Sequence, residues 1–104
     1  MITLYPINEY KSGFILKGHA EYAESGKDIV CSAVSSLAQS VFLTINKEYK
    51  ITHIQSHGFL EVNYEEILGI LLYVRVLLTG MEEIAKQYPS YVSISEEEYK
   101  DEEN

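Results

Sequence analysis

The pattern of hydrophobic and polar positions along the chain predicts five short strands. Two β-prone runs at residues 2–7 and 13–18 are joined by the polar stretch NEYKSG, which is typical of a turn. Residues 49–56 and 58–63 form a second pair of candidate strands, and YVSIS at 91–95 alternates like a last strand. The pattern therefore predicts two hairpins and one further strand.

Helical spacing is found in the two segments between these strands. Asp28 precedes a run in which apolar residues recur every three or four positions, which predicts a helix with Asp28 as N-cap and an end near Asn46. The apolar stripe of that helix is Val30, Val34, Leu37, Val41 and Ile45. Asn63 is a candidate N-cap of a second helix, with Glu66 as its reciprocal acid and an end near Gln87.

The resulting order, ββαββαβ, predicts an α/β (α+β) fold. Two helices and about five strands suit a two-layer sandwich with both helices on one face of the sheet. Residues 1–95 are expected to form a single domain. The second helix is apolar nearly all round between residues 67 and 78, so one of its faces needs a partner other than the sheet. We therefore expect a homodimer through the second helix.

The charge distribution restricts the range of partners. The formal net charge of −8 disfavours direct binding of nucleic acid, which normally depends on Lys and Arg. Residues 96–104 hold six acidic side chains against one lysine, and such a run is typical of a solvated, frayed terminus. Attraction of the tail to a basic partner is the alternative interpretation.

The cysteine content and the apolar runs indicate the compartment. A single cysteine cannot close an internal disulfide, and no charged segment followed by an apolar one opens the sequence. The longest apolar run, 67–78, includes Arg75 and is shorter than the ~20 residues that a bilayer span needs. We expect a soluble cytoplasmic protein without a membrane segment.

One stretch, GHAEYAESGKDIVC, carries candidate chemistry. It places Cys31 in the first turn of the first predicted helix, where the helix dipole favours a thiolate, and it places His19 before the loop as a candidate base. Gly18 and Gly26 bracket that loop. The alternative is structural: Cys31 is a small buried hydrophobe, Asp28 is only a helix cap, and His19 is a strand-end side chain.

Other kinds of site have weaker support. His53 and His57 are four residues apart on a predicted strand, roughly 13 Å, which is too far to share a metal ion. The sequence contains no Walker loop, dinucleotide fingerprint or G-x-S-x-G elbow. We therefore predict neither a metal site nor a cofactor.

The segment GHAEYAESGKDIVCSAVS, residues 18–35, resembles the signature of the ribosomal-processing cysteine protease Prp family of small bacterial proteins. GFLEV and GMEEIAKQYPSYV are also similar to that family, so the resemblance covers nearly the whole chain except the acidic tail. It implies a two-layer α/β fold and a dimer. It also implies removal of a short N-terminal extension from a large-subunit ribosomal protein precursor, a peptide substrate.

The resemblance also assigns residues. It places the catalytic pair at His19 and Cys31, and Asp28 and Ser35 match further motif positions, while Ser32 stands where the family more often has alanine. Within the loop we expect Gly18, Tyr22 and Gly26 to belong to a mobile segment that closes over the substrate.

Two functions remain open from the sequence. In the first, His19 takes the Cys31 proton, the thiolate attacks the scissile carbonyl, and helix-start N–H groups hold the oxyanion. Asp28 then orients His19, or faces the thiolate and makes the Cys31 thiol harder to deprotonate, or only caps the helix, and the sequence does not choose between these. In the second, the protein is a non-catalytic assembly factor that binds a basic ribosomal protein, and Cys31 is simply buried.

Overall fold

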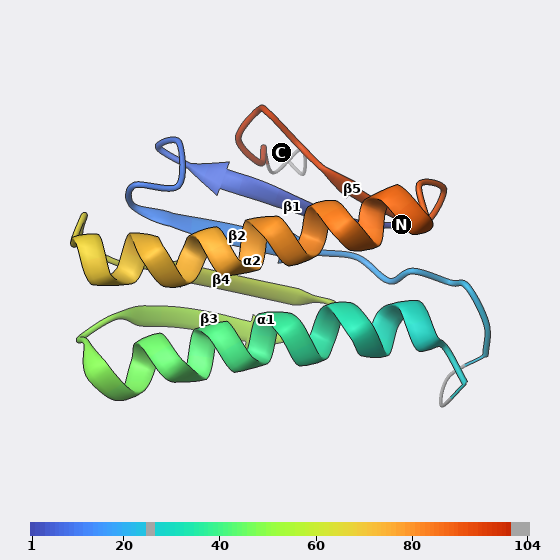
Figure 1. Cartoon of the computed structure of the whole chain (residues 1–104), viewed down its shortest axis with the longest axis horizontal. Helices are drawn as coiled ribbons and strands as arrows, with labels where there is room; N and C mark the ends of the chain where they lie inside the picture. The colour runs from blue at the N-terminus through green and yellow to red at the C-terminus, as the bar shows by residue number, and fades with distance from the viewer. Residues whose placement is uncertain (25–26, 101–104) are drawn as a thin grey trace.

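A computed structural model describes residues 1–24 and 27–100 and confirms the predicted order ββαββαβ. The elements are β1 (Ile2–Ile7), β2 (Gly13–Lys17), α1 (Ile29–Glu48), β3 (Thr52–Ser56), β4 (Phe59–Asn63), α2 (Leu68–Gln87) and β5 (Val92–Ile94). Both helices lie side by side on one face of a single sheet, which gives the expected two-layer sandwich (Figure 1).

The sheet has the strand order β3-β4-β2-β1-β5. All neighbouring strands are antiparallel except β1 and β5, which pair in parallel. This order brings the C-terminal end of β2 next to the β3–β4 turn, although the two are far apart in the sequence. The backbone N–H of Gly18 donates to the carbonyl oxygen of Gly58 at 2.9 Å. The order of the strands therefore determines which residues surround His19.

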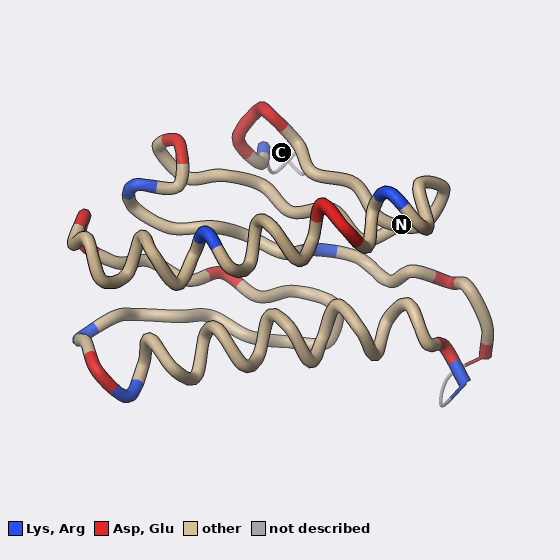
Figure 2. Tube along the Cα trace, in the orientation of Figure 1, with Lys and Arg blue, Asp and Glu red and all other residues tan. Residues whose placement is uncertain are grey.

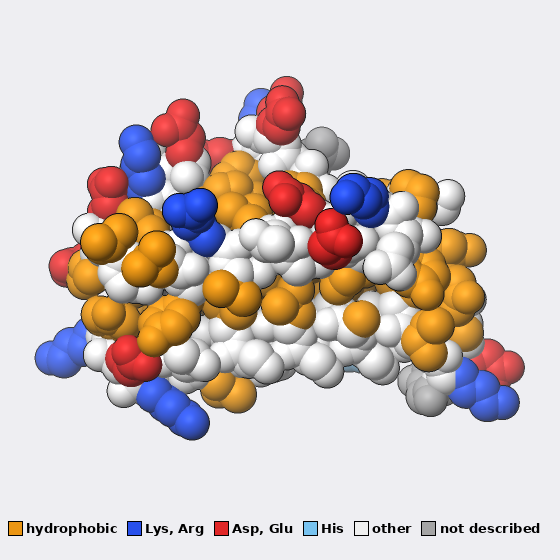
Figure 3. Space-filling view, viewed as in Figure 1, with side chains coloured by type: hydrophobic (Ala, Val, Ile, Leu, Met, Phe, Trp, Pro, Cys, Tyr) orange, Lys and Arg blue, Asp and Glu red, His pale blue; other side chains and the backbone are white. Residues whose placement is uncertain are grey.

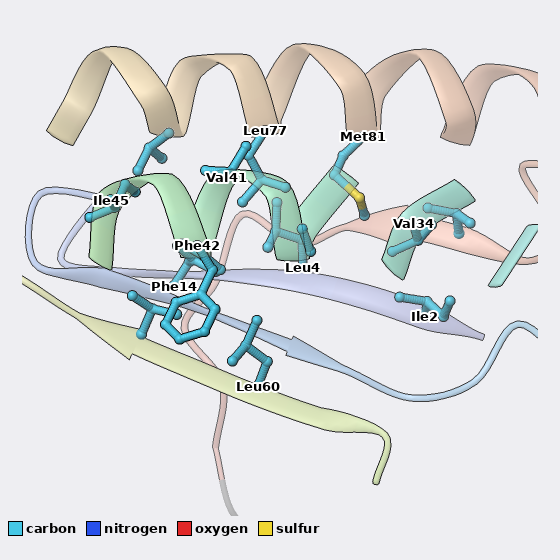
Figure 4. Close-up of a cluster of buried hydrophobic side chains, with 14 of the residues drawn as sticks. Ile2, Leu4, Phe14, Val34, Val41, Phe42, Ile45, Leu60, Leu77 and Met81 are labelled. Carbon is cyan, nitrogen blue, oxygen red and sulfur yellow. The ribbon is translucent and has the colours of Figure 1, made fainter. Parts of the chain in front are cut away.

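The hydrophobic core fills the space between the sheet and the helices. Alternate residues of each central strand point to the helical side, as Ile2 and Leu4 of β1 do (Figure 4). The buried stripe of α1 is Val30, Val34, Ala38, Val41, Phe42 and Ile45. By length and hydropathy alone α1 could cross a bilayer, but this stripe packs into the core as in a globular domain.

The start of α1 is as predicted and that of α2 is not. Asp28 caps α1, which runs two residues further than expected, to Glu48. Asn63 is instead the last residue of β4, and α2 begins at Leu68 after an N-cap residue, Ile67, without a side-chain cap. The reason is pairing: Asn63 has strand partners on both sides, and the next N–H, that of Tyr64, donates to Ser12.

The C-terminal segment packs beside the sheet over the part that is described, residues 96–100. Glu98 accepts a hydrogen bond from the backbone N–H of Asn8 at 2.8 Å, and the Tyr99 hydroxyl bonds to Lys17 Nζ at 2.7 Å. The Tyr99 ring also meets Tyr5 edge-on at 5.2 Å. The run of acidic residues did not indicate these contacts; residues 101–104 lie outside the described part of the chain.

Candidate active site

The entry into α1 is organised by the Asp28 carboxylate. One oxygen accepts the backbone N–H of Cys31 at 2.8 Å, and the other accepts those of Tyr22 at 2.9 Å and Ala23 at 3.4 Å. The Cys31 N–H contributes most to the lowered pKa of Asp28; desolvation opposes it, and the N–H groups of Tyr22, Ala23 and Val30 lower the pKa further by smaller amounts. Asp28 therefore holds the preceding loop against the first turn of the helix.

Cys31 lies in that first turn and is partly buried. Its neighbour Val30 and, one turn later, Val34 are fully buried, so the thiol stands at the edge of the core. Between Asp28 and Lys47 the helix carries no charged side chain (Figure 2). The Cys31 N–H donates to the Asp28 carboxylate and the Ser32 N–H to the Asp28 carbonyl, so these two N–H groups of the first turn are already paired.

His19 follows β2 and rests on the β3–β4 turn. Its ring centroid is 4.7 Å from that of His57, with the two rings tilted by 41°. A Cβ atom added to Gly58 would come within 2.5 Å of His19 Nε2, so glycine leaves the space that the imidazole occupies. His57 was missed as a site residue because sequence spacing tested it only as a metal ligand beside His53. The position of His57 in a tight turn between two predicted strands was the sequence feature that could have indicated it.

Two adjoining clefts bring the predicted residues together. One of about 190 Å³ and one of about 350 Å³ share four lining residues, His19, Cys31, Ser35 and His57. Asp28 lines the larger cleft, and Gln39 and Gln55 line the smaller. Within residues 1–24 and 27–100, no three His, Cys, Asp or Glu side chains are arranged to hold a metal ion. A thiol, two imidazoles and a hydroxyl can therefore meet one bound substrate.

The loop residues differ in their surroundings. Gly18 lines the smaller cleft at a φ of +111°, a conformation that favours glycine, and a Cβ atom added there would collide with the Met1 carbonyl oxygen. Tyr22 is 42% exposed, yet its ring meets Tyr88 and Tyr91 edge-on at 5.5 and 5.2 Å. Gly26, the third predicted loop residue, lies outside the described residues.

Comparisons with known proteins identify the family of the chain. The model of one family, described as cysteine protease Prp, matches residues 1–93. The chain belongs to the Prp family of cysteine proteases. This family consists of hydrolases that use a cysteine for catalysis. The matched range contains all the residues that line the two clefts.

The chain is also similar to individual members of the Prp family. The ribosomal processing cysteine protease Prp of Mycoplasma genitalium is 29% identical over 96 residues, which cover 89% of this chain and 96% of that protein. A crystal structure of the essential ribosomal processing protease Prp from S. aureus, in complex with a covalently linked product peptide, superposes with a TM-score of 0.77 at 22% identity. It covers 96% of this chain and all of that one.

A second S. aureus Prp structure, in complex with a substrate peptide, also has a TM-score of 0.77, at 20% identity. It covers 91% of this chain and 98% of that one. At this level of identity the two crystal structures establish the shared fold.

Proposed function

We propose that this protein is a cysteine endopeptidase that removes the N-terminal extension of a large-subunit ribosomal protein precursor, with Cys31 as nucleophile and His19 as base. One observation carries the proposal: in a chain of the Prp family, His19, which follows β2, and Cys31, in the first turn of α1, line the same two clefts. The relatives from M. genitalium and S. aureus are named for ribosomal processing, which supports this substrate class.

The residues supply the steps of acyl transfer. His19 accepts the proton of the Cys31 thiol, and the thiolate attacks the scissile carbonyl to form a tetrahedral intermediate. The intermediate collapses to a thioester as the amine leaves with the proton from His19, and water, deprotonated by His19, then releases the acid. Ser35, one turn after Cys31, lines both clefts, where it can contact a peptide held against the thiol.

Asp28 has a supporting role in this proposal. Because its carboxylate is bound to the backbone N–H groups of Cys31, Tyr22 and Ala23, it fixes the thiol relative to the loop rather than orienting His19. The Tyr22 ring anchors the same loop to the end of α2 and the start of β5 through Tyr88 and Tyr91. Closure of the loop over a peptide would have to keep or replace this aromatic contact.

The outer face of the helical layer supports a homodimer. Leu68, Leu72 and Val76 are 72%, 50% and 56% exposed and follow each other at four-residue steps along α2. Hydrophobic side chains continue along the seam between the two helices, where Leu37, Val76 and Gly80 line an open groove (Figure 3). A second copy would cover this surface while leaving β3 and the clefts at His19 accessible. We place the dimer in the cytoplasm, where its substrate is made.

Cleavage of the extended precursor tests the proposal. The wild-type protein should shorten it at a single bond, and Cys31→Ala should leave it whole while still binding it, since covalent catalysis is lost but the fold is kept. Ser32→Ala is a matched control at the next position and should cleave at a rate close to that of wild type. Mass spectrometry identifies the bond, and a pull-down measures binding.

Two results would favour the assembly-factor alternative. One is wild-type protein that binds the precursor without cutting it, and the other is Cys31→Ala that cuts as fast as wild type. Circular dichroism of Cys31→Ala ensures that loss of cleavage is not loss of folding.

A further inference from the structure

A histidine that acts as a base needs a neighbouring group to hold its ring in a productive orientation. In this site Asp28 does not supply that group, because its carboxylate accepts the backbone N–H groups of the loop and of Cys31 and makes no hydrogen bond to His19. Within residues 1–24 and 27–100, no group hydrogen-bonds to the His19 imidazole. The orientation of His19 must therefore come from packing.

The β3–β4 turn supplies that packing. Register pairs Ser56 with Phe59, so the turn consists of His57 and Gly58 alone. Gly58 has a φ of +73°, which favours glycine, and the absence of a side chain there makes room for the His19 ring. The His57 ring lies against the side of the same imidazole, at 4.7 Å between centroids and within the range of favourable aromatic contacts.

The turn is also tied to the backbone that carries His19. The N–H of Gly18, the residue before His19, donates to the Gly58 carbonyl at 2.9 Å. The same two-residue turn therefore contacts both the backbone next to His19 and the His19 ring. His57 itself is exposed and lines both clefts, so its ring is available at the site rather than committed to the core.

We propose that His57 is a positioning residue, whose ring packs against His19 and limits rotation of the imidazole that accepts the Cys31 proton. This inference rests on the proposed function of His19. The contact needs a flat ring at position 57 and not a second ionisable nitrogen. A ring without nitrogens should therefore substitute for His57, whereas loss of the ring should leave His19 free to turn away from the thiol.

Three variants separate this role from a general effect on the fold. His57→Ala removes the ring, and His57→Phe keeps a ring of similar width. His53→Ala is the matched control, because His53 is also an exposed histidine with a ring contact, to Phe42 at 4.7 Å. We expect kcat for the precursor peptide to fall about 10-fold in His57→Ala, since small misplacements of a catalytic group are costly, with KM within about twofold. His57→Phe and His53→Ala should keep kcat within about threefold.

A second readout needs no substrate. The rate at which iodoacetamide alkylates Cys31 at neutral pH should fall in His57→Ala and in His19→Ala, and should stay near the wild-type rate in His57→Phe. Thermal unfolding of all variants shows whether the fold is intact. The proposal is overturned if His57→Ala keeps wild-type kcat and alkylation rate, or if His57→Phe is as impaired as His57→Ala. Wild-type protein that cleaves nothing would instead count against the proposed protease function.

Discussion

At the scale of single residues, Asp28 had one role that the sequence could predict and one that it could not. Its position before an apolar stripe was enough to predict an N-cap, because that role depends only on local spacing. The choice between capping the helix and orienting His19 could not be made, since it depends on where the loop returns. The structure directs both carboxylate oxygens to backbone N–H groups.

The Asp28 contacts make stability depend on pH in a predictable direction. Its pKa in the fold is below the ordinary value of 3.8, so the charged form is favoured by folding. The stabilisation is fully present above that ordinary value and is lost as the pH falls through the lowered pKa. Asp28→Asn should therefore melt lower than wild type at neutral pH, and the difference should shrink in acid.

Thermal unfolding monitored by circular dichroism at several pH values measures this difference. Glu24→Gln, an exposed carboxylate in the same loop, is the control and should change the melting temperature little at any pH. A gap between Asp28→Asn and wild type that stays constant into strong acid would contradict the assignment of the effect to the carboxylate charge.

His57 marks the limit of prediction at this scale. His19, Asp28, Cys31 and Ser35 lie within one continuous motif, so a local reading could place them together. His57 reaches His19 only because β4 is inserted between β2 and β3 in the sheet. Strand order depends on non-local pairing, which hydrophobic periodicity does not determine.

At the scale of elements, hydrophobic periodicity predicted type and order well and boundaries less well. Both helices have long apolar stripes, and this spacing was enough to predict that each segment is a helix. The start of α2 was predicted too early because Asn63 is as suitable for a strand end as for an N-cap, and sheet pairing on both sides decided the outcome. The exposed leucines of α2 were predicted from the same pattern, as an apolar face beyond what the sheet could cover.

The outer face of α2 gives a prediction about assembly. Leu72→Glu should convert a dimer of about twice 11.9 kDa into a monomer, because a charge would be buried without a partner at the interface. Ile54→Glu is the matched control: Ile54 is 58% exposed on β3, away from the helical layer, and its replacement should leave the dimer intact. Sedimentation equilibrium measures both masses. Wild-type protein that stays monomeric at high micromolar concentration would exclude this interface.

At the scale of the whole molecule, the two-layer arrangement followed from the order of elements, because two long amphipathic helices and one sheet can bury their apolar faces only against each other. The packing of residues 96–100 could not be anticipated. A run of like charges favours solvation, but here Tyr99, in the middle of the acidic tail, finds Tyr5 and Phe59 beside the sheet.

The Tyr99 contacts should contribute measurably to stability. Tyr99→Ala removes two aromatic contacts, the cation–π contact of Lys17 and the hydrogen bond that Lys17 donates, and should lower the free energy of unfolding by about 1–2 kcal/mol. Lys100→Ala at the next position should change it by less than about 0.5 kcal/mol. Urea denaturation measures both. Equal stability of Tyr99→Ala and wild type would mean that the tail does not hold this position in solution.

The parallel pairing of β1 with β5 has a consequence for the order in which the molecule opens. The Thr3 and Ser93 hydroxyls that meet across this pair are 90 positions apart, so their pairing carries a large loop-closure cost, whereas the β1–β2 and β3–β4 hairpins close locally. β5 has only three residues, lies at the sheet edge, and is expected to exchange its amide hydrogens first. Since Tyr91 precedes β5 and contacts the Tyr22 ring, each such local opening also weakens one of the two ring contacts that hold the loop leading to Cys31, while Tyr88 and Asp28 keep theirs.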